Sequence, residues 1–231
     1  MKIVILAAGK GVRMNHLTLD RPKPMIEIDN HPFLAYLFEI IHNSGFVDKD
    51  IGIVVGYKKE KIVDFLKSKN LKCKIIEQKE QIGTAHAIGC AQRFVNKDNF
   101  LVIMADNIYS ENDIMSIKKD DDFCYMAGYH HDDPRRFGII VEKDGFVEKL
   151  VEKPDHPPSN MINTGLYKFT PEIFEAIKTI HKSPRGEYEI TDAIMLLAKK
   201  KKVRVIHAKT WIDLGKPEDI EKVEEFLRKR K

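Results

Sequence analysis

A glycine-rich segment with two basic side chains stands near the start of the chain, in the run LAAGKGVRM. Glycines such as Gly9 and Gly11 let backbone N–H groups approach an anion closely, and Lys10 and Arg13 add positive charge. The segment therefore predicts a phosphate-binding loop. It fits neither common fingerprint, because a dinucleotide-binding loop would have a third glycine at Met14 and a P-loop would end in Gly-Lys-Ser/Thr. A turn that uses glycine only for its geometry is the alternative.

A lysine held between two prolines follows, in the run RPKPM. Pro22 and Pro24 each fix their own φ angle and restrict the residue before them, so Lys23 is presented in nearly one backbone conformation. Such a lysine is suited to aiming its ammonium group at a phosphate. A proline-bounded surface turn is the plainer interpretation of the same residues.

An acidic residue, Asp106, follows the apolar run Phe100–Met104. Sheets of α/β proteins bind ligands at the carboxyl ends of their strands, and a carboxylate there suits Mg²⁺, which prefers oxygen ligands. A lone aspartate at a strand end is more often a turn or helix cap. Both interpretations are open on the pattern of this segment alone.

The composition of the chain limits the classes of function in which these residues can take part. The 231 residues are 43% hydrophobic and 32% charged, which is typical of a globular protein. No apolar run approaches the roughly 18 to 20 residues of a membrane span, and the N-terminal run lacks the layout of a signal peptide. The net charge of +4 is too small to indicate a nucleic-acid partner. Three cysteines without C-x-x-C spacing argue against a disulfide framework or a zinc site, so we expect a cytoplasmic protein.

Apolar runs that alternate with amphipathic ones predict the elements that position these residues. Apolar runs without internal alternation are typical of parallel strands covered by helices on both faces. In the first half we predict strands over Lys2–Leu6, Ile51–Val55, Lys74–Ile76 and Phe100–Met104, and helices over Phe33–Asn43, Lys58–Lys67 and Ala85–Phe94. The first half is thus predicted to be a parallel α/β arrangement.

A hairpin signal changes this pattern in the second half. Lys143-Asp144-Gly145 separates the strand-like runs Ile139–Glu142 and Phe146–Val151, which adds antiparallel structure and makes the sheet mixed. Further predicted elements are strands over Met161–Phe169 and Val203–Ala208, a helix that opens at Thr170-Pro171, and helices over Ile190–Lys199 and Pro217–Arg228. Together they predict one continuous α/β domain.

The motifs, taken in order, resemble those of the sugar-1-phosphate nucleotidylyltransferases. Besides LAAGKGVRM, RPKPM and Asp106, they are Gln78 followed by GTAHA at 83–87, Gly138, VEKP at 151–154, NTG at 163–165, GEYEITD at 186–192 and WIDLGKPE at 211–218. The resemblance covers essentially the whole chain. Two positions depart from the family pattern: Val12 replaces a threonine near the triphosphate, and Ala105 replaces a glycine beside the ribose. We expect no β-helical acetyltransferase extension of the kind that some relatives carry, since nothing follows Lys231.

The resemblance implies a Rossmann-like three-layer α/β fold with a mixed, mainly parallel central sheet. Residues 1–231 would form a single domain, with about 1–122 binding the nucleotide and about 123–231 the sugar phosphate. The implied reaction joins a nucleoside triphosphate, UTP or dTTP by preference, to a sugar 1-phosphate and releases pyrophosphate. Mg²⁺ is the implied cofactor. A homo-oligomer stays open because oligomers are common in the family.

The resemblance also implies roles residue by residue. Arg13 would hold the β and γ phosphates, Lys23 the phosphates at the reaction centre and Lys153 the sugar phosphate. Asp106 and Asp213 would bind Mg²⁺. The implied nucleotide-binding positions are Ala8, Gly9, Gly11, Gln78, Gly83 and Thr84, and the implied sugar-binding positions are Gly138, Glu152, Asn163 and Thr164.

Physical arguments accompany two of these roles. The amide of Gln78 can offer both a donor and an acceptor to the edge of a pyrimidine base. Lys153 directly follows Glu152, and neighbouring side chains in a strand leave opposite faces, so we expect a bend at Pro154 that lets both reach one ligand. A surface Glu–Lys pair is the alternative interpretation of these two residues.

Three classes of function stay open at this point. Small cytidylyltransferases of similar length activate phosphocholine and other non-sugar phosphates, but Glu152 and Asn163 favour a sugar. A glycosyltransferase of similar architecture usually has an Asp-x-Asp motif, whereas Asp106 is followed by Asn107 and Ile108. A non-catalytic nucleotide-sugar sensor would be free to lose Lys23 or a metal ligand, and this sequence has kept them. The sequence leaves the sugar and the choice between UTP, dTTP and CTP undetermined.

Overall fold

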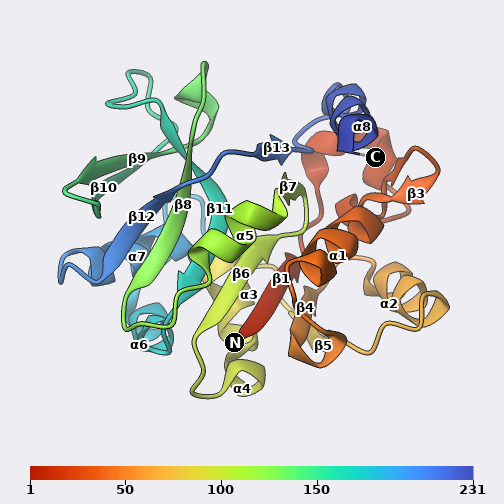
Figure 1. The fold of residues 1–231 in the computed structure, drawn as a ribbon, viewed down its shortest axis with the longest axis horizontal. Helices are drawn as coiled ribbons and strands as arrows, with labels where there is room; N and C mark the ends of the chain where they lie inside the picture. The colour runs from red at the N-terminus through yellow and green to blue at the C-terminus, as the bar shows by residue number, and fades with distance from the viewer. Residues whose placement is uncertain (231) are drawn as a thin grey trace.

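The computed structural model describes residues 1–230. Its central sheet contains β1 (Lys2–Ala7), β4 (Ile51–Val55), β5 (Lys74–Glu77), β6 (Phe100–Met104), β8 (Cys124–His130), β9 (Gly138–Lys143), β10 (Phe146–Glu152), β11 (Met161–Phe169) and β12 (Val203–His207). The strand order is β5-β4-β1-β6-β11-β8-β12-β10-β9 (Figure 1). The first four strands in this order pair in parallel. Beyond β6 the pairing is antiparallel, except that β8 and β12 are parallel.

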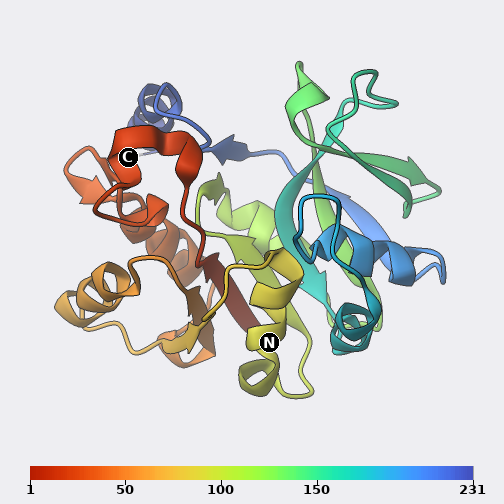
Figure 2. The same cartoon turned by 180° about the vertical axis from the view of Figure 1, so that it is seen from behind.

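Helices cover both faces of the sheet (Figures 1 and 2). One apolar core contains side chains of α1 (Phe33–Asn43), α2 (Lys59–Ser68), α5 (Glu111–Ile117) and α8 (Asp219–Arg230). A second core contains side chains of α3 (Thr84–Cys90), α4 (Gln92–Val95), α6 (Glu172–Thr179) and α7 (Ile190–Ala198). Ile3 and Ile5 of β1 enter the first core and Val4 the second, because successive side chains of a strand point to opposite faces. The predicted three-layer α/β fold with a mixed sheet is confirmed.

Two short ladders lie outside the central sheet. β7 (Asn107–Tyr109) pairs antiparallel with β13 (Trp211–Asp213), and β2 (Glu27–Ile28) pairs with β3 (His31–Pro32). Neither ladder, nor β8, was predicted from the sequence. Segments of two or three residues are too short to show the period of two that marks a strand.

The predicted helices are present with one difference. The run Ala85–Phe94 is broken at Ala91 into α3 and α4. Gly89 stands in the last turn before the break, and glycine is a poor helix former. Within residues 1–230, no helix has the length and apolar character needed to cross a membrane.

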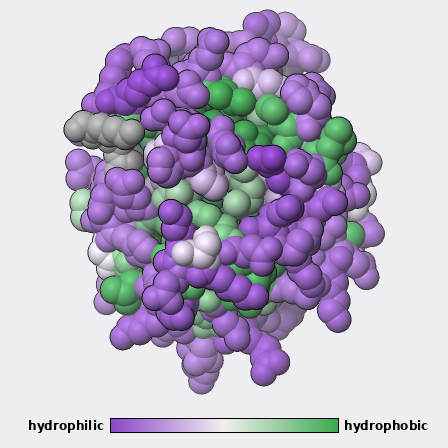
Figure 3. Space-filling model, turned by 90° about the vertical axis from the view of Figure 1, so that its right-hand side faces the viewer, coloured by the Kyte–Doolittle hydropathy of each residue, from purple (hydrophilic) through white to green (hydrophobic). Residues whose placement is uncertain are grey.

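The surface on the side of α8, β3 and α2 is mostly hydrophilic (Figure 3). Apolar side chains show there in recesses between the polar ones. The large aliphatic and aromatic residues are thus directed to the two cores, and the polar loops at the carboxyl ends of the parallel strands are left to form a site.

Candidate active site

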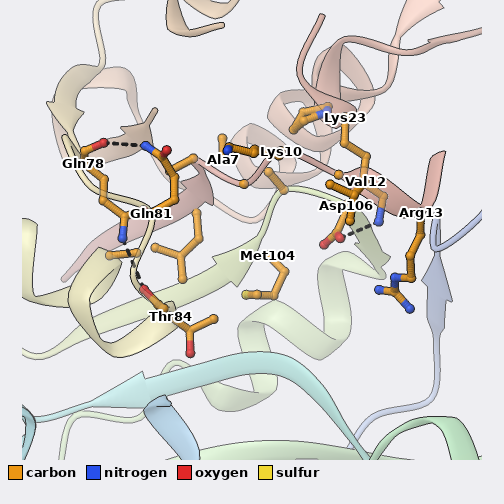
Figure 4. Close-up of a pocket in the computed structure, with 18 of the residues that line it drawn as sticks. Ala7, Lys10, Val12, Arg13, Lys23, Gln78, Gln81, Thr84, Met104 and Asp106 are labelled. Carbon is orange, nitrogen blue, oxygen red and sulfur yellow. Dashed lines mark hydrogen bonds and ion pairs between the residues drawn. The ribbon is translucent and has the colours of Figure 1, made fainter. Parts of the chain in front are cut away.

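A cavity of about 700 Å³ opens at the carboxyl ends of β1 and β6 (Figure 4). The loop after β1 forms one wall, and residues around Gln78 and the start of α3 form the other. Every nucleotide-binding position that the sequence analysis named lines this cavity: Ala8, Gly9, Gly11, Gln78, Gly83 and Thr84. Arg13, Lys23 and Asp106 line it as well. The chain therefore brings the predicted phosphate loop, the lysine and the strand-end aspartate to one place.

The two glycines of the loop have different structural roles. Gly11 has a φ of 63°, a left-handed conformation that favours glycine, and a Cβ there would lie 2.9 Å from Lys23 Cβ. Gly11 is thus required for the loop to pack on Lys23. Nothing lies within 4 Å of where a Cβ of Gly9 would be, so the space over its backbone is open to a ligand. Arg13 is exposed and makes no ion pair within residues 1–230.

Lys23 begins the short 3₁₀ helix η2 (Lys23–Met25), between the two prolines. Its residue is only 6% exposed, and its Nζ donates a hydrogen bond to Asp106 Oδ2 at 2.6 Å. A buried ammonium needs such a partner, because removing an unpaired charge from water costs several kcal/mol or more. The rigid lysine is thereby held beside the aspartate rather than directed into solvent.

The ladder of β7 and β13 places the second aspartate beside the first. Asp213 stands opposite Asn107 in the register, and the N–H of Leu214 donates to the backbone oxygen of Asp106 at 2.9 Å. Burial, and then the negative charge of Asp106, raise the pKa of Asp213 to about 6. Within the described part of the chain the Asp213 carboxylate forms no hydrogen bond or ion pair. A bound cation would offset the repulsion between these two negative charges.

The donor set fits a hard divalent cation. Asp106 immediately precedes β7 and Asp213 ends its partner strand β13, so the two residues supply carboxylate oxygens at one end of this ladder. Mg²⁺ usually takes one or two carboxylates together with phosphate oxygens and water. Within residues 1–230 no group of three His, Cys, Asp or Glu side chains could form an all-protein metal site. A cation held by Asp106 and Asp213 would thus be completed by substrate oxygens.

Gln78 uses part of its amide inside the protein. Its residue is 3% exposed, and Nε2 donates to the backbone oxygen of Gly83 at 3.2 Å and lies 3.0 Å from His86 Nδ1. Nε2 therefore already donates to the loop before α3. Oε1 is the amide atom that can accept a hydrogen bond from a base. We expected Gln78 to present both groups, and the structure reduces this to the acceptor.

Gly83 is required by a segment far away in sequence. Its φ is 119°, and a Cβ there would overlap the backbone of Tyr188. The N–H of Ala85 donates to Tyr188 O at 2.9 Å, and the N–H of Ile190 donates to Thr84 Oγ1 at 3.0 Å. The absence of a side chain at Gly83 thus allows a close approach to residues 188–190, which ties the nucleotide cavity to the second half of the chain.

Three of the predicted sugar-binding residues line a smaller cavity of about 90 Å³. Gly138 and Glu152 are opposite each other in the β9–β10 ladder, and Asn163 lies on the adjoining strand β11. A Cβ at Gly138 would lie 3.1 Å from Glu152 Oε2 and 3.8 Å from Asn163 Cβ, so it would crowd the carboxylate of Glu152 and make an ordinary contact with Asn163. Thr191 and Asp192 at the start of α7 complete the wall.

Thr164 does not offer its side chain to this cavity. The residue is 1% exposed, and its Oγ1 donates to Ala127 O at 2.8 Å. The hydroxyl holds β11 on β8, and the role of Thr164 as a sugar-binding position stays a prediction. Periodicity did not reveal this, because β11 is buried on both faces.

The expected bend after β10 is present, one residue earlier than Pro154. Lys153 has a φ of 41°, and its Nζ lies 3.4 Å from Glu152 Oε1. Both side chains thus reach the same side, although their positions in a regular strand would separate them. Lys153 lines neither cavity, and the two side chains are about half exposed at 49% and 50%.

Several residues that line the nucleotide cavity were not predicted from the sequence. Gln81 donates from Nε2 to Gln78 O at 3.0 Å and fills the corner beside Gly56. Met104 lines the floor, and Glu187 reaches in from the second half of the chain. The repeated glutamine in QKEQIG is the one feature that could have pointed to Gln81.

A model of the nucleotidyl transferase family matches residues 2–230. The chain belongs to the nucleotidyl transferase family. The chain is 37% identical to the UTP–glucose-1-phosphate uridylyltransferase AglF of Haloferax volcanii, with 99% of this chain and 97% of that protein covered. It is 42% identical to the bifunctional protein GlmU of Methanocaldococcus jannaschii, with 98% of this chain covered, but it spans only 54% of that longer relative.

Solved structures share the fold of this nucleotidyl transferase. A putative glucose-1-phosphate thymidylyltransferase from Bacillus anthracis, solved with sucrose, has a TM-score of 0.86 at 26% identity and covers 99% of this chain and 95% of its own. A UDP-glucose pyrophosphorylase in complex with UDP-glucose has a TM-score of 0.83 at 26% identity and covers 100% and 99%. The resemblance stated from the motifs is thereby confirmed along the whole length of the chain.

The two departures from the family pattern lie in the nucleotide cavity of this nucleotidyl transferase. Val12 is 76% exposed and Ala105 is 2% exposed, and both line the cavity. The backbone N–H of Ala105 donates to Leu6 O at 3.1 Å. This hydrogen bond continues the pairing of β1 and β6 one residue past the end of β6, so it fixes the backbone directly before Asp106.

Proposed function

We propose that this nucleotidyl transferase joins UTP or dTTP to a sugar 1-phosphate, with Mg²⁺ as cofactor, and releases pyrophosphate and a nucleotide sugar. The observation that carries the proposal is the ion pair of Lys23 and Asp106 in a nucleotide-sized cavity, with Asp213 placed next to Asp106 by the β7–β13 ladder. Relatives named for glucose-1-phosphate uridylyl and thymidylyl transfer support the sugar 1-phosphate as acceptor.

The proposed chemistry needs neither a general base nor a protein nucleophile. A sugar phosphate is largely dianionic at neutral pH, so its oxygen can attack the α-phosphorus in line with the leaving pyrophosphate. Since anions repel one another during this approach, the protein must supply alignment and positive charge. A cation held by Asp106 and Asp213 would neutralise charge on the reacting phosphates.

The chain's own cations divide this work in the proposal. Lys23 is rigid and buried beside Asp106, which suits it to the phosphates at the reaction centre. Arg13, exposed at the end of the glycine loop, is suited to the β and γ phosphates. Lys153, which the bend after β10 turns toward Glu152, is suited to the sugar phosphate. Each of these groups neutralises charge that increases or moves in the transition state.

In this proposal, Oε1 of Gln78 determines which base is preferred. A pyrimidine such as uracil or thymine presents an N–H between two carbonyl groups, and Gln78 Oε1 can accept from that N–H. The backbone of the loop at Gly9 is open to the ligand. The cytoplasm, where nucleoside triphosphates are made, is the proposed location of the reaction.

The experiment that tests the proposal measures pyrophosphate release. The purified chain is incubated with UTP, dTTP, CTP, ATP or GTP, each paired with glucose 1-phosphate, N-acetylglucosamine 1-phosphate or phosphocholine. We expect turnover with UTP or dTTP and a sugar 1-phosphate, lost with EDTA and restored with Mg²⁺. Best turnover of phosphocholine would replace the sugar assignment, and best use of GTP would contradict the role of Gln78. No release with any pair would contradict the proposed function.

A further inference from the structure

The backbone carbonyl of Thr164 accepts three side-chain hydrogen bonds. Tyr109 OH donates at 2.6 Å, Asn107 Nδ2 at 3.1 Å and Trp211 Nε1 at 3.2 Å. A strand carbonyl ordinarily accepts one N–H of the neighbouring strand, so this convergence is unusual. Because the carbonyl can only accept, it also fixes the amide of Asn107 with its NH₂ group toward Thr164.

A bulge in β11 makes this carbonyl available. The register between β11 and β8 shifts between Asn163 and Tyr167, and Gly165 has a φ of 79°. A Cβ at Gly165 would overlap Met104, so only glycine fits the turn of the chain there. The bulge removes Thr164 O from the regular ladder and directs it toward β7 and β13.

All three donors come from the short ladder that carries the carboxylates. Asn107 directly follows Asp106, and the register pairs Asn107 with Asp213 and Tyr109 with Trp211. The acceptor, in turn, lies one residue after Asn163 of the sugar cavity. The three bonds therefore join the part of the molecule that holds Asp106 and Asp213 to the strand that lines the proposed sugar site.

We refer to these three hydrogen bonds to Thr164 O as the junction, and one of its residues has a cost in stability. Asn107 Oδ1 is buried and has no hydrogen-bond partner among the described residues. A buried acceptor without a partner lowers stability, and an apolar residue of similar size would avoid that penalty. The amide is therefore best explained by what its NH₂ group holds.

A second contact strengthens the same junction. The ring of Trp211 meets the ring of Phe137 edge to face, with centroids 5.2 Å apart and planes at 88°. Phe137 directly precedes Gly138 of the sugar cavity. Trp211 thus contacts the sugar side at two points, through its indole N–H and through its ring.

We propose that Tyr109, Asn107 and Trp211 are positioning residues that set the geometry between the carboxylate pair and the sugar site. By holding Thr164 O, they fix how far Asp106 and Asp213 lie from the groups that bind the sugar phosphate, and so the in-line approach of its oxygen. This inference rests on the proposed function. It predicts that loosening the junction lowers kcat and weakens cation binding, while the base-binding part of the nucleotide cavity, around Gln78 and Gly83, is unaffected.

Tyr109→Phe tests the inference, because it keeps the fully buried ring and removes the shortest of the three bonds. The matched control is Tyr125→Phe. Tyr125 is also buried, and its OH donates to Asp121 Oδ2 at the same 2.6 Å, but it lines neither cavity. Each variant loses the short hydrogen bond that its tyrosine hydroxyl donates, and Tyr109→Phe also loses the longer one that the hydroxyl accepts from Asn107 Nδ2 at 3.3 Å. A purely structural effect should therefore lower both melting temperatures without separating the activities of the two variants.

Three quantities are measured on the wild type and both variants: kcat, the KM for UTP, and the Kd for Mn²⁺ by calorimetry or EPR on the full chain. We expect Tyr109→Phe to lower kcat about tenfold, as small misplacements of reacting groups do, and to raise the Kd for Mn²⁺ severalfold, with an unchanged KM for UTP. Tyr125→Phe should leave all three unchanged. Equal behaviour of the two variants would overturn the inference.

Trp211→Phe gives an independent arm if Tyr109→Phe does not fold. It keeps an aromatic ring beside Phe137 and removes the indole N–H. The same rise in the Kd for Mn²⁺ is expected, and an unchanged Kd would contradict the inference. A wild type that binds Mn²⁺ but releases no pyrophosphate would instead contradict the proposed function, and the comparison of Mn²⁺ affinities would still decide on the positioning residues.

Discussion

The nucleotide cavity and the sugar cavity are built in different ways. In the first, the polar groups are buried and already held: Lys23 by Asp106, and Gln78 by Gly83 and His86. In the second, Glu152 is half exposed and is paired with the side chains of Lys153 and Arg185, at 3.4 and 3.9 Å. Buried, fixed groups are suited to an invariant substrate part such as a triphosphate, whereas exposed side chains can be exchanged without disturbing the core.

This difference has a consequence for specificity. Changes in the nucleotide cavity should alter every reaction of the enzyme, because they move groups that the fold itself positions. Changes at Glu152 should alter the choice among sugars and leave the phosphate chemistry intact. Changes at Asn163 should also alter this choice, but its Oδ1 accepts from the N–H of Gly165 at 3.1 Å, so they act on the bulge of β11 as well. The comparison can therefore be tested by substitutions on each side.

The largest effect is expected at the boundary between the two cavities. Asp106→Asn and Asp213→Asn should each lower turnover by about two orders of magnitude or more, the scale of a lost charge-stabilising group. The measurement is pyrophosphate release over a range of Mg²⁺ concentrations. Asp144→Asn, in the left-handed turn between β9 and β10, is the matched control, since asparagine also adopts this conformation. Near wild-type turnover in the double variant would exclude these residues as cation ligands.

The next effect is expected inside the nucleotide cavity. Gln78→Leu removes both the acceptor and the hydrogen bond to Gly83 O. We expect the KM for UTP to rise about tenfold, which corresponds to one lost hydrogen bond of about 1.4 kcal/mol, for every sugar 1-phosphate alike. Gln92→Leu, in α4 outside the cavity, is the control. If Gln78→Leu changed the preference among sugar 1-phosphates instead of raising the KM for UTP uniformly, the two cavities would not act separately.

Smaller and more selective effects are expected on the sugar side. Lys153→Ala should raise the KM for all sugar 1-phosphates by a similar factor, because it removes a phosphate contact. Glu152→Gln and Asn163→Ala should change the ratio of kcat/KM between glucose 1-phosphate and N-acetylglucosamine 1-phosphate. The KM for the nucleotide should hardly change in any of the three. Variants that are indifferent to the sugar would contradict the sugar assignment.

The smallest effect concerns stability and has the opposite sign. The pKa of Asp213 is about 6 in the folded protein against an ordinary value of 3.8. Its ionisation therefore destabilises the metal-free fold progressively from about pH 4 to about pH 6, and the full penalty applies at higher pH. Asp213→Asn removes this penalty. We expect its melting temperature in EDTA at about pH 7.5 to exceed that of the wild type by about 2–4 °C, with a smaller difference at about pH 5. An equal or lower melting temperature at the higher pH would contradict the strained carboxylate pair.

The sequence by itself determined the parallel first half and the nucleotide loop. The strands and helices there are long enough to show their periods, and Ala8 to Arg13 follow a strand directly, so local pattern and site coincide. The proline-bounded Lys23 was also found from sequence, because proline restricts the backbone without help from the rest of the fold. Phe33–Asn43, with its proline start and glycine stop, was predicted with the bounds that the structure shows.

Only the tertiary structure decided how the second aspartate meets the first. The β7–β13 ladder joins segments about a hundred residues apart through three pairs, which no local period reveals. The use of Gly83 against Tyr188, the inward hydroxyl of Thr164 and the carbonyl that accepts three donors likewise depend on contacts between distant segments. Local propensity acts over a few neighbouring residues, whereas these contacts are fixed by packing, which forms only when the whole sheet is assembled.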